Sequence, residues 1–105
     1  MRLLRPRSLF ARLAWLLVAA VAVALALAFA AEGTRVNAIA PGWIETAMTA
    51  VPRANAARNA ELLARMPLGR WATEAEIAGP VLFLLSDVAS MITGAHLPID
   101  GGMTC

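Results

Sequence analysis

The most extended apolar run of the chain lies close to its N-terminus, where Leu13 to Ala31 contains no polar residue. A helix over these residues would rise about 28 Å, close to the ~30 Å hydrocarbon thickness of a bilayer. Large and small residues alternate between Ala20 and Ala30, and this period of two would favour a strand. Alanine is the best helix former, however, and Gly33 can supply a left-handed cap. We therefore predict a long apolar helix that ends near Ala31.

The pattern beyond this helix is that of an ordinary α/β domain. Residues Arg35–Ala40 alternate polar and apolar, then run apolar up to Pro41-Gly42, which predicts a largely buried strand. An alanine-rich stretch follows, with a helix expected over Ala56–Arg65 and a break at Pro67-Leu68-Gly69. Polar and apolar positions therefore predict a strand, a turn and a helix in succession.

A second helix is predicted to begin after Thr73. Thr73 and Glu76 form a capping box, in which each side chain accepts a hydrogen bond from the other residue's backbone N–H. Pro80 lies inside this helix and predicts a bend. His96–Ile99 reads as a strand at a sheet edge, because Pro98 cannot donate to a ladder. We expect the helix to bury four apolar residues: Ile77, Val81, Leu84 and Leu85.

Strand, helix, helix and strand amount to roughly one crossover unit. A doubly wound sheet of six or seven strands needs well over ~150 residues at about 30 residues per unit, and the chain has 105. The predicted fold class is therefore α/β: the C-terminal part of a Rossmann-like doubly wound parallel sheet, preceded by a long apolar N-terminal helix.

Charge is distributed unevenly along the sequence. Arg2, Arg5, Arg7 and Arg12 lie in the first twelve residues without any acid, whereas the acids exceed the arginines in the rest of the chain. This distribution predicts no nucleic-acid partner, because the excess positive charge flanks an apolar segment and does not cover a folded surface. A basic start, an apolar centre and Ala28-Phe29-Ala30 also fit a secretory signal or a membrane helix with its N-terminus in the cytoplasm.

Several kinds of chemistry are excluded for this chain by residue type. It contains no tyrosine, and all nine of its Lys and Arg residues are arginine. Cys105 is the only cysteine and His96 the only histidine, so no disulfide can form within the chain and His96 is expected to be structural. The seven acids form no pattern typical of metal ligands, so no metal site is predicted.

Three stretches resemble the C-terminal part of the short-chain dehydrogenase/reductase (SDR) family. They read RVNAIAPGWIETAM from Arg35, PLGRWATEAEIAGPVLFLLSD from Pro67 and ASMITGAHLPIDGGM from Ala89. In this order and spacing they are highly specific, and the resemblance extends from about Ala24 to Met103. It divides the chain into a basic, apolar segment over residues 1–23 and a partial SDR domain over residues 24–105.

The resemblance implies hydride transfer between NAD or NADP and a carbonyl or alcohol carbon, with a tyrosine acid/base assisted by a lysine. Counted back without gaps, the lysine would fall near Trp15 and the tyrosine near Ala11, and neither is present. The glycine-rich phosphate turn is missing as well. We therefore expect no catalytic residue here, and binding of NAD or NADP by this chain alone is in doubt.

The part of the family's site that the chain does contain is one wall of the cofactor pocket. By resemblance, Pro41 and Gly42 shape the turn beneath the nicotinamide, the Ile44 backbone meets its carboxamide, and the Thr46 hydroxyl contacts the carboxamide or a phosphate. Residues 47–66 would correspond to the substrate lid. From the residues alone, Pro41-Gly42 is simply a turn and Thr46 a helix cap.

Three hypotheses about the whole chain stay open at this point. The chain is a C-terminal fragment of a cytoplasmic SDR enzyme and inactive by itself, or a membrane-anchored or exported non-enzymatic protein carrying a small α/β module. In the second case Leu13 to Ala31 would associate with the membrane. A third possibility is an oligomer, or a subunit that completes its sheet with another chain.

Overall fold

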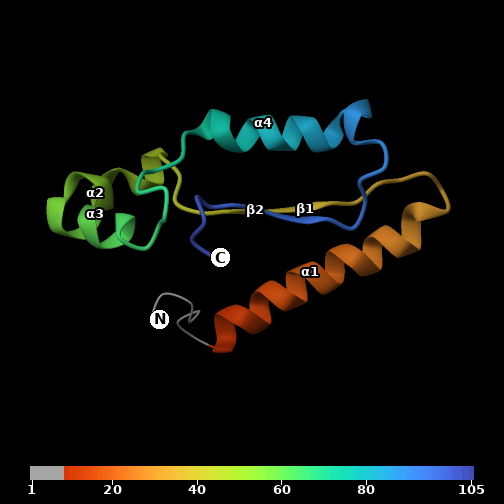
Figure 1. Ribbon diagram of the computed structural model, residues 1–105, viewed down its shortest axis with the longest axis horizontal. Helices are drawn as coiled ribbons and strands as arrows, with labels where there is room; N and C mark the ends of the chain where they lie inside the picture. Colours follow the sequence, from red (N-terminus) through yellow and green to blue (C-terminus); the bar gives the residue numbers. More distant parts are fainter. Residues whose placement is uncertain (1–8) are drawn as a thin grey trace. The chain divides into compact units, whose positions relative to one another are not determined.

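The computed structural model describes residues 9–105, so the predictions for Arg2, Arg5 and Arg7 lie outside the described residues. In chain order the elements are α1 (Leu9–Ala30), β1 (Ala38–Pro41), the 3₁₀ helix η2 (Ala47–Thr49), α2 (Ala50–Ala54), α3 (Ala56–Leu63), α4 (Glu74–Leu85), the 3₁₀ helix η3 (Asp87–Ala89) and β2 (His96–Ile99) (Figure 1). These elements form two compact units. Of the described residues, one unit contains residues 9–39 with Phe83–Leu97, and the other contains Ala40–Leu82 with Pro98–Cys105.

The two strands β1 and β2 pair in a single two-stranded sheet. The Ala38 N–H donates to the Ala95 carbonyl at 2.9 Å, and the Gly42 N–H donates to the Ile99 carbonyl at 3.0 Å. Both pairs have the same sequence offset, so the strands run parallel. The α/β class and the parallel sheet are thus confirmed, while β1 begins later than predicted and ends one residue later, at Pro41.

The sequence before β1 is extended but is held mainly by side chains. Arg35 Nη1 donates to the Leu84 carbonyl at 2.7 Å, and Asn37 Nδ2 donates to the Ile92 carbonyl at 3.0 Å. The Asn37 Oδ1 also accepts from the Ala95 N–H at 3.0 Å. These contacts join residues 49 to 58 positions apart in sequence, and they fix the segment where a regular ladder was expected.

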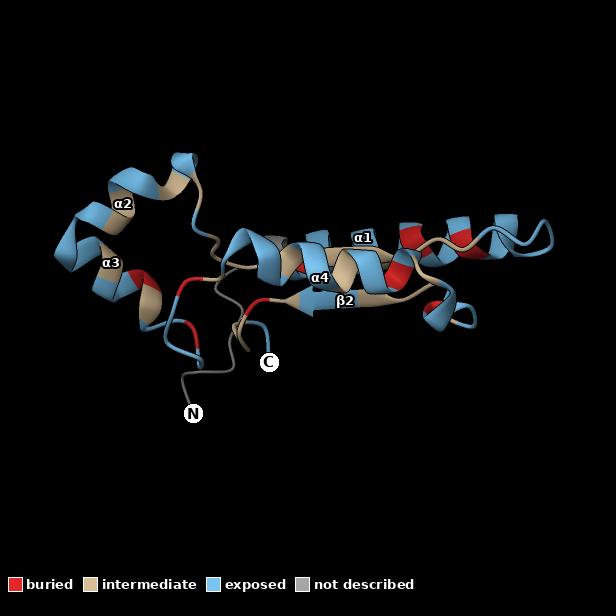
Figure 2. Cartoon of the chain, turned by 90° about the horizontal axis from the view of Figure 1, so that it is seen from above, coloured by how far each residue is buried: buried red, intermediate tan, exposed pale blue. Residues whose placement is uncertain are grey.

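α1 is the predicted apolar helix, and it ends one residue before the predicted position. Gly33 adopts a positive φ of 77° just beyond it, which is the expected left-handed cap. Its packing is unusual, because Ala22 and Ala26 are buried while large residues such as Leu16 and Leu27 are exposed (Figure 2). A Cβ placed on Gly94 would meet the Ala26 methyl at 3.4 Å, so the backbone at Gly94 approaches this alanine face closely.

α4 begins with the predicted capping box and continues through Pro80. Leu84 is buried, and Ile77 and Val81 are half-buried, as the helical pattern predicts. Leu85, however, is 73% exposed, so the prediction that it is buried is wrong. At about 100° per residue, Leu84 lies almost directly above Ile77, whereas Leu85 lies about 80° away from it and leaves the buried stripe.

The short helices α2 and α3 follow the loop after β1. Pro52 lies in the first turn of α2, where its missing N–H costs no helical hydrogen bond. α3 begins at Asn55, whose side chain accepts from the Arg58 N–H at 2.9 Å, and it ends two residues before the predicted Arg65. Behind α3, the buried Trp71 indole N–H donates to the Asn59 Oδ1 at 2.6 Å, which ties the loop before α4 to this helix.

Candidate functional site

The turn after β1 requires a glycine because the backbone of another segment lies against it. A Cβ on Gly42 would meet the Asp100 Cα at 2.8 Å and the Asp100 Cβ at 2.9 Å, both too close for any larger residue. Pro41 ends the strand, and because it has no N–H it leaves no ladder donor unpaired there. Pro41 and Gly42 thus turn the chain at the carboxyl end of β1, as the sequence predicts.

Ile44 lies in an isolated parallel bridge with Ala72. The residues on either side of it make the bonds: the Ala72 N–H donates to the Trp43 carbonyl at 3.0 Å, and the Glu45 N–H donates to the Ala72 carbonyl at 2.8 Å. Because successive backbone groups of an extended chain point to opposite sides, the Ile44 N–H points away from Ala72. Among the described residues this N–H donates no hydrogen bond, so it could donate to a ligand acceptor.

Thr46 is half-buried and occupies the N-cap position of η2. Its N–H donates to the Thr49 Oγ1 at 3.0 Å, and that oxygen lies 2.8 Å from the Ile44 carbonyl. Arg53 Nη2 donates to the Thr46 carbonyl at 3.0 Å. Thr49 and Arg53 therefore hold the backbone of the loop that carries Ile44 and Thr46.

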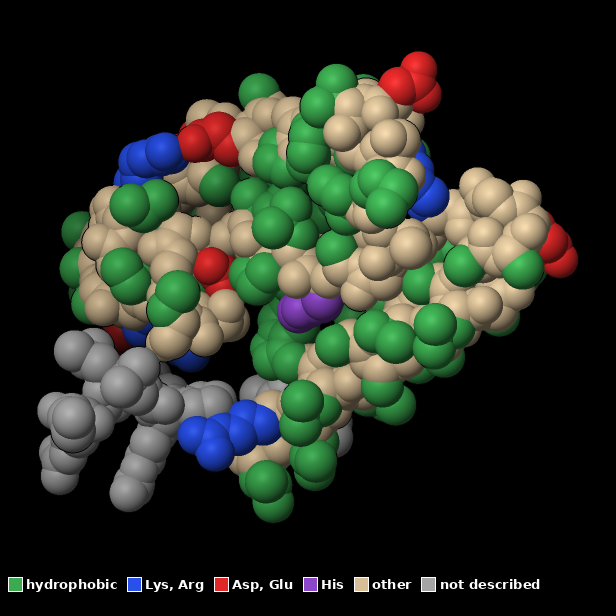
Figure 3. All heavy atoms as spheres, turned by 45° about the vertical axis from the view of Figure 1, so that its right-hand side comes forward, with side chains coloured by type: hydrophobic (Ala, Val, Ile, Leu, Met, Phe, Trp, Pro, Cys, Tyr) green, Lys and Arg blue, Asp and Glu red, His purple; other side chains and the backbone are tan. Residues whose placement is uncertain are grey.

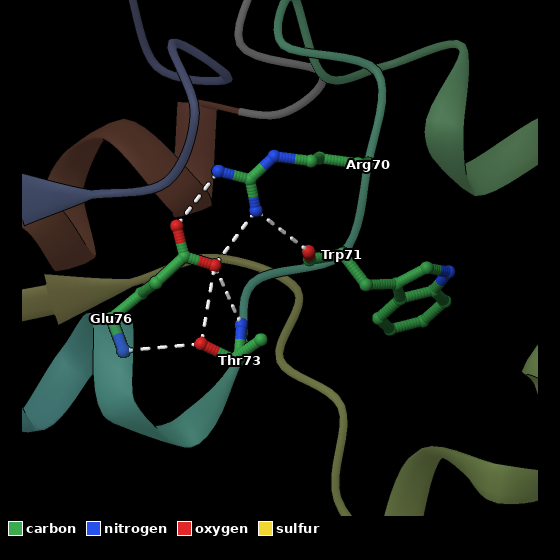
Figure 4. A network of polar contacts seen from close by, with 4 residues as sticks. All are labelled: Arg70, Trp71, Thr73 and Glu76. Carbon is green, nitrogen blue, oxygen red and sulfur yellow. Dashed lines mark hydrogen bonds and ion pairs between the residues drawn. The ribbon is translucent and has the colours of Figure 1, made fainter.

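Ala72 pairs with Ile44, and the residues around Ala72 are held by a network of polar contacts among Arg70, Thr73 and Glu76 (Figure 4). Both Arg70 Nη atoms donate to the Glu76 carboxylate at 2.7 Å, and the Thr73 N–H donates to the same carboxylate at 3.0 Å. The hydrogen bonds from Arg70, followed by that from Thr73, lower the pKa of Glu76 to about 2. The Glu76 carboxylate in turn raises the pKa of the Arg70 guanidinium.

Asp100 organises the glycine turn that follows β2. It is 8% exposed, and its Oδ1 accepts from the Gly102 N–H at 3.0 Å. Its Oδ2 accepts from the Thr104 hydroxyl at 2.5 Å and from the Thr104 N–H at 3.2 Å. These bonds hold in place the backbone that Gly42 contacts, so Asp100 supports the candidate site from the carboxyl end of the neighbouring strand β2.

A pocket in the unit formed by Ala40–Leu82 and Pro98–Cys105 is too small for a dinucleotide. It has a volume of about 130 Å³ and is lined mainly by Trp43, Met66, Ile99 and Asp100. Pockets for drug-sized ligands and cofactors usually enclose ~300–1,000 Å³. The described residues of this unit can therefore provide one side of a cofactor site but do not enclose a cofactor.

The structure places Pro41 at the end of β1, and the other three predicted site residues, Gly42, Ile44 and Thr46, on the loop that follows it. Sequence reasoning missed Thr49, Arg53 and Asp100, which hold this loop. Thr49 follows Thr46 by three residues in the spacing of a helix N-terminus, and this local signal could have identified it. Among the described residues there is no group of three or more His, Cys, Asp or Glu residues that could hold a metal ion.

Comparison with known proteins identifies the ancestry of this arrangement. The model of a family described as enoyl-(acyl carrier protein) reductase matches residues 14–104. The chain belongs to the short-chain dehydrogenase/reductase family. The SDR match begins ahead of residue 24, within α1, and the division of the chain at residues 23 and 24 stays a prediction.

Individual SDR proteins are much longer than the region that this chain matches. The chain is 46% identical over 80 residues to a 2-dehydro-3-deoxy-D-gluconate 5-dehydrogenase of Pseudoalteromonas atlantica, covering 76% of this chain and 32% of that protein. It thus spans about a third of the length of the curated relatives it matches. The matched region of this chain therefore corresponds to about a third of the length of these SDR proteins.

Two solved SDR structures share the fold of the described residues. An Agrobacterium tumefaciens protein described as a 2-deoxy-D-gluconate 3-dehydrogenase, with bound NADP, has a TM-score of 0.76 and 50% identity, covering 82% of this chain and 35% of its own. A 4-hydroxyisoleucine dehydrogenase complexed with NADH has a TM-score of 0.79 and 32% identity, covering 83% and 36%. Each of these two structures therefore contains a bound nicotinamide dinucleotide.

Proposed function

We propose that this chain supplies the nicotinamide-facing wall of an SDR-type NAD(P)-dependent oxidoreductase and does not catalyse hydride transfer by itself. The proposal rests chiefly on the Ile44 N–H, which points away from the Ala72 bridge without a partner among the described residues. A carboxamide oxygen is a suitable acceptor for such a donor.

The position of the loop supports the same function. In open α/β sheets, ligands bind outside the carboxyl ends of the strands, and Gly42, Ile44 and Thr46 follow the carboxyl end of β1. The half-buried Thr46 lies two residues after Ile44, so its side chain could add a second polar contact to the carboxamide or a phosphate. Pro41 and Gly42 fix the direction in which both residues leave the strand.

The chemistry of the chain explains why catalysis is assigned elsewhere. NAD(P), when bound, supplies or accepts the hydride, and the family's tyrosine and lysine handle the proton. This chain has neither residue type, and Trp15 lies near the position where the family's lysine is expected. The Trp15 ring packs 5.6 Å from the His96 ring, centroid to centroid, so this position serves packing.

The partner that best fits this function is a polypeptide that completes the sheet. β1 and β2 each have one neighbour among the described residues, which leaves a strand edge available for pairing. The completing chain would carry the glycine-rich turn and the Tyr–Lys pair, in the cytoplasm, where NAD(P) is available. The substrate would then be chosen by the whole assembly together with residues 47–66.

A chimeric enzyme tests the proposal. Residues 35–103 replace the corresponding segment of the Pseudoalteromonas atlantica dehydrogenase, which is 46% identical over the matched region. We expect the chimera to retain dehydrogenase activity, and Thr46→Ala in it to raise the KM for the cofactor about fivefold, the equivalent of one neutral hydrogen bond of ~1 kcal/mol.

The control variant is Ser90→Ala in the same chimera, which changes an exposed serine just after η3, away from the loop that follows β1. It should leave the KM for the cofactor unchanged. A folded chimera without measurable cofactor binding, or equal effects of Thr46→Ala and Ser90→Ala, would contradict the assignment of this loop.

A further inference from the structure

Exposed hydrophobic side chains are spread over much of the face shown in Figure 3. Because the chain spans about a third of the length of its relatives, this exposure identifies no particular ligand. Hydrogen bonds made entirely between described residues do not depend on what else covers the surface. Those of the loop after β1 restrict which backbone atoms this loop can offer to a cofactor.

Both backbone groups of Ile44 lie on the same side of this loop. The Trp43 carbonyl and the Glu45 N–H each bond to Ala72, at 3.0 and 2.8 Å. In an extended segment, the N–H and the carbonyl of the residue between them point to the opposite side. The Ile44 N–H and the Ile44 carbonyl therefore both face away from Ala72, on the side that the proposed function assigns to the cofactor.

The Ile44 carbonyl already has a partner on that side, because the Thr49 Oγ1 lies 2.8 Å from it. A threonine hydroxyl has one hydrogen to donate and two lone pairs that accept. The Thr49 Oγ1 accepts from the Thr46 N–H at 3.0 Å and from the Arg53 Nε at 3.3 Å. Both lone pairs are thus used, and the hydroxyl hydrogen is left to bond a carbonyl.

Two carbonyls lie within reach of that hydrogen. The Thr46 carbonyl is 3.1 Å from the Thr49 Oγ1, but it already accepts from the Arg53 Nη2 at 3.0 Å and from the Thr49 N–H at 3.2 Å. The Ile44 carbonyl is closer and accepts no other hydrogen bond among the described residues. Thr49 therefore occupies the Ile44 carbonyl and leaves the Ile44 N–H open.

We propose, building on the function proposed above, that Thr49 is a positioning residue that makes Ile44 a donor-only contact for the cofactor. The loop then binds the nicotinamide carboxamide through its oxygen, in one orientation, and offers its amino group no acceptor at Ile44. A dinucleotide whose pyridine ring carries a carbonyl without an amino group should make the same contact. Without the Thr49 hydroxyl, the Ile44 carbonyl becomes an acceptor that only an amino group can satisfy.

Thr49→Val tests this role, because it removes the hydroxyl at nearly the same side-chain volume. The chimeric enzyme is titrated calorimetrically with the oxidised cofactor and with its 3-acetylpyridine analogue, which has a methyl group in place of the amino group. We expect the ratio of the analogue's dissociation constant to that of the cofactor to rise about fivefold in Thr49→Val. This rise is equivalent to one neutral hydrogen bond of ~1 kcal/mol.

Two further variants separate this role from support of the loop. Thr49→Ser keeps the hydroxyl and should restore the ratio of the unsubstituted chimera. Arg53→Ala removes two hydrogen bonds to the loop but leaves the Thr49 hydroxyl on the Ile44 carbonyl, so both dissociation constants should rise with no change in their ratio. In the full chain, carbon-13 NMR should show the Ile44 carbonyl resonance moving upfield in Thr49→Val but not in Arg53→Ala.

The ratio of the two dissociation constants separates this role from the proposed function. An unchanged ratio in Thr49→Val, with both constants raised equally, would show that Thr49 only supports the loop and would overturn this inference alone. An equal rise of the ratio in Arg53→Ala, or an Ile44 resonance unaffected by Thr49→Val, would overturn it as well. A folded chimera that binds neither the cofactor nor its analogue would overturn the proposed function and this inference together.

Discussion

At the scale of single residues, the loop after β1 depends on contacts that tolerate no larger side chain. We expect Gly42→Ala to lower the free energy of unfolding by about 1–3 kcal/mol, because the added Cβ would lie 2.8 Å from the Asp100 Cα. Urea denaturation measures the change. Gly79→Ala is the matched control, since a Cβ there meets nothing within 4 Å and alanine favours the helix. Equal effects of the two substitutions would contradict the close approach at Gly42.

The Glu76 carboxylate gives a prediction about pH. Its pKa, lowered to about 2 by Arg70 and Thr73, lies below the ~4.3 of an unfolded glutamate. The charged form therefore favours the folded state: its stabilising effect is complete above about pH 4 and is lost as the pH falls toward 2. Because the pair is exposed, salt should weaken this effect.

The measurement is an NMR titration of the Glu76 side chain. Arg70→Gln should move its pKa up toward the ordinary value, since Arg70 makes the largest contribution. Arg58→Gln should not, because Arg58 pairs with Glu61 at 2.9 Å on another helix. An unchanged Glu76 pKa in Arg70→Gln would rule out Arg70 as the cause.

At the scale of elements, α3 and the loop before α4 are joined through one indole. The Trp71 ring is 7% exposed, lies 6.2 Å from the Trp43 ring, and donates to Asn59 on α3. Asn59→Ala should destabilise the protein by about 1–3 kcal/mol, because it leaves a buried N–H without an acceptor. The effect should be smaller in a Trp71→Phe background, where the donor is already gone.

A double-mutant cycle in urea measures this coupling. Asn55→Ala, which removes the N-cap of α3 without touching Trp71, serves as the comparison and should show additive behaviour with Trp71→Phe. Additive free energies for Asn59→Ala and Trp71→Phe would mean that the 2.6 Å contact contributes nothing to stability.

At the scale of the whole molecule, the chain matches the SDR family over most of its own length but covers only a third of its relatives. We expect the purified chain to show no NADH- or NADPH-dependent reduction of sugar acids, polyol-derived ketones or acyl-carrier-protein thioesters, because it contains no tyrosine and no lysine. Absorbance of the reduced cofactor measures this directly. Turnover that survives purification to a single intact mass would contradict the proposed function.

Contacts between residues close in sequence could be predicted from the sequence, whereas contacts between distant residues could not. The capping box of Thr73 and Glu76 and the cap at Gly33 were predicted because both involve neighbours in sequence. The contacts of Arg35 and Asn37 with residues of the 84–95 segment were not, because they join residues about fifty or more positions apart. For the candidate site, Gly42 was predicted as a turn, but its need to be glycine comes from Asp100.

The sequence by itself determined which residue types are present and which local patterns they form. It therefore established the family, the helical nature of the apolar segment, the order of helices and strands, and the absence of a tyrosine or lysine for catalysis. Only the tertiary structure decided that α1 packs through Ala22 and Ala26, that Leu85 is exposed, and that the Ile44 N–H points away from its bridge. The physical reason is that the face a helix or an amide presents depends on segments distant in sequence, which local periodicity does not encode.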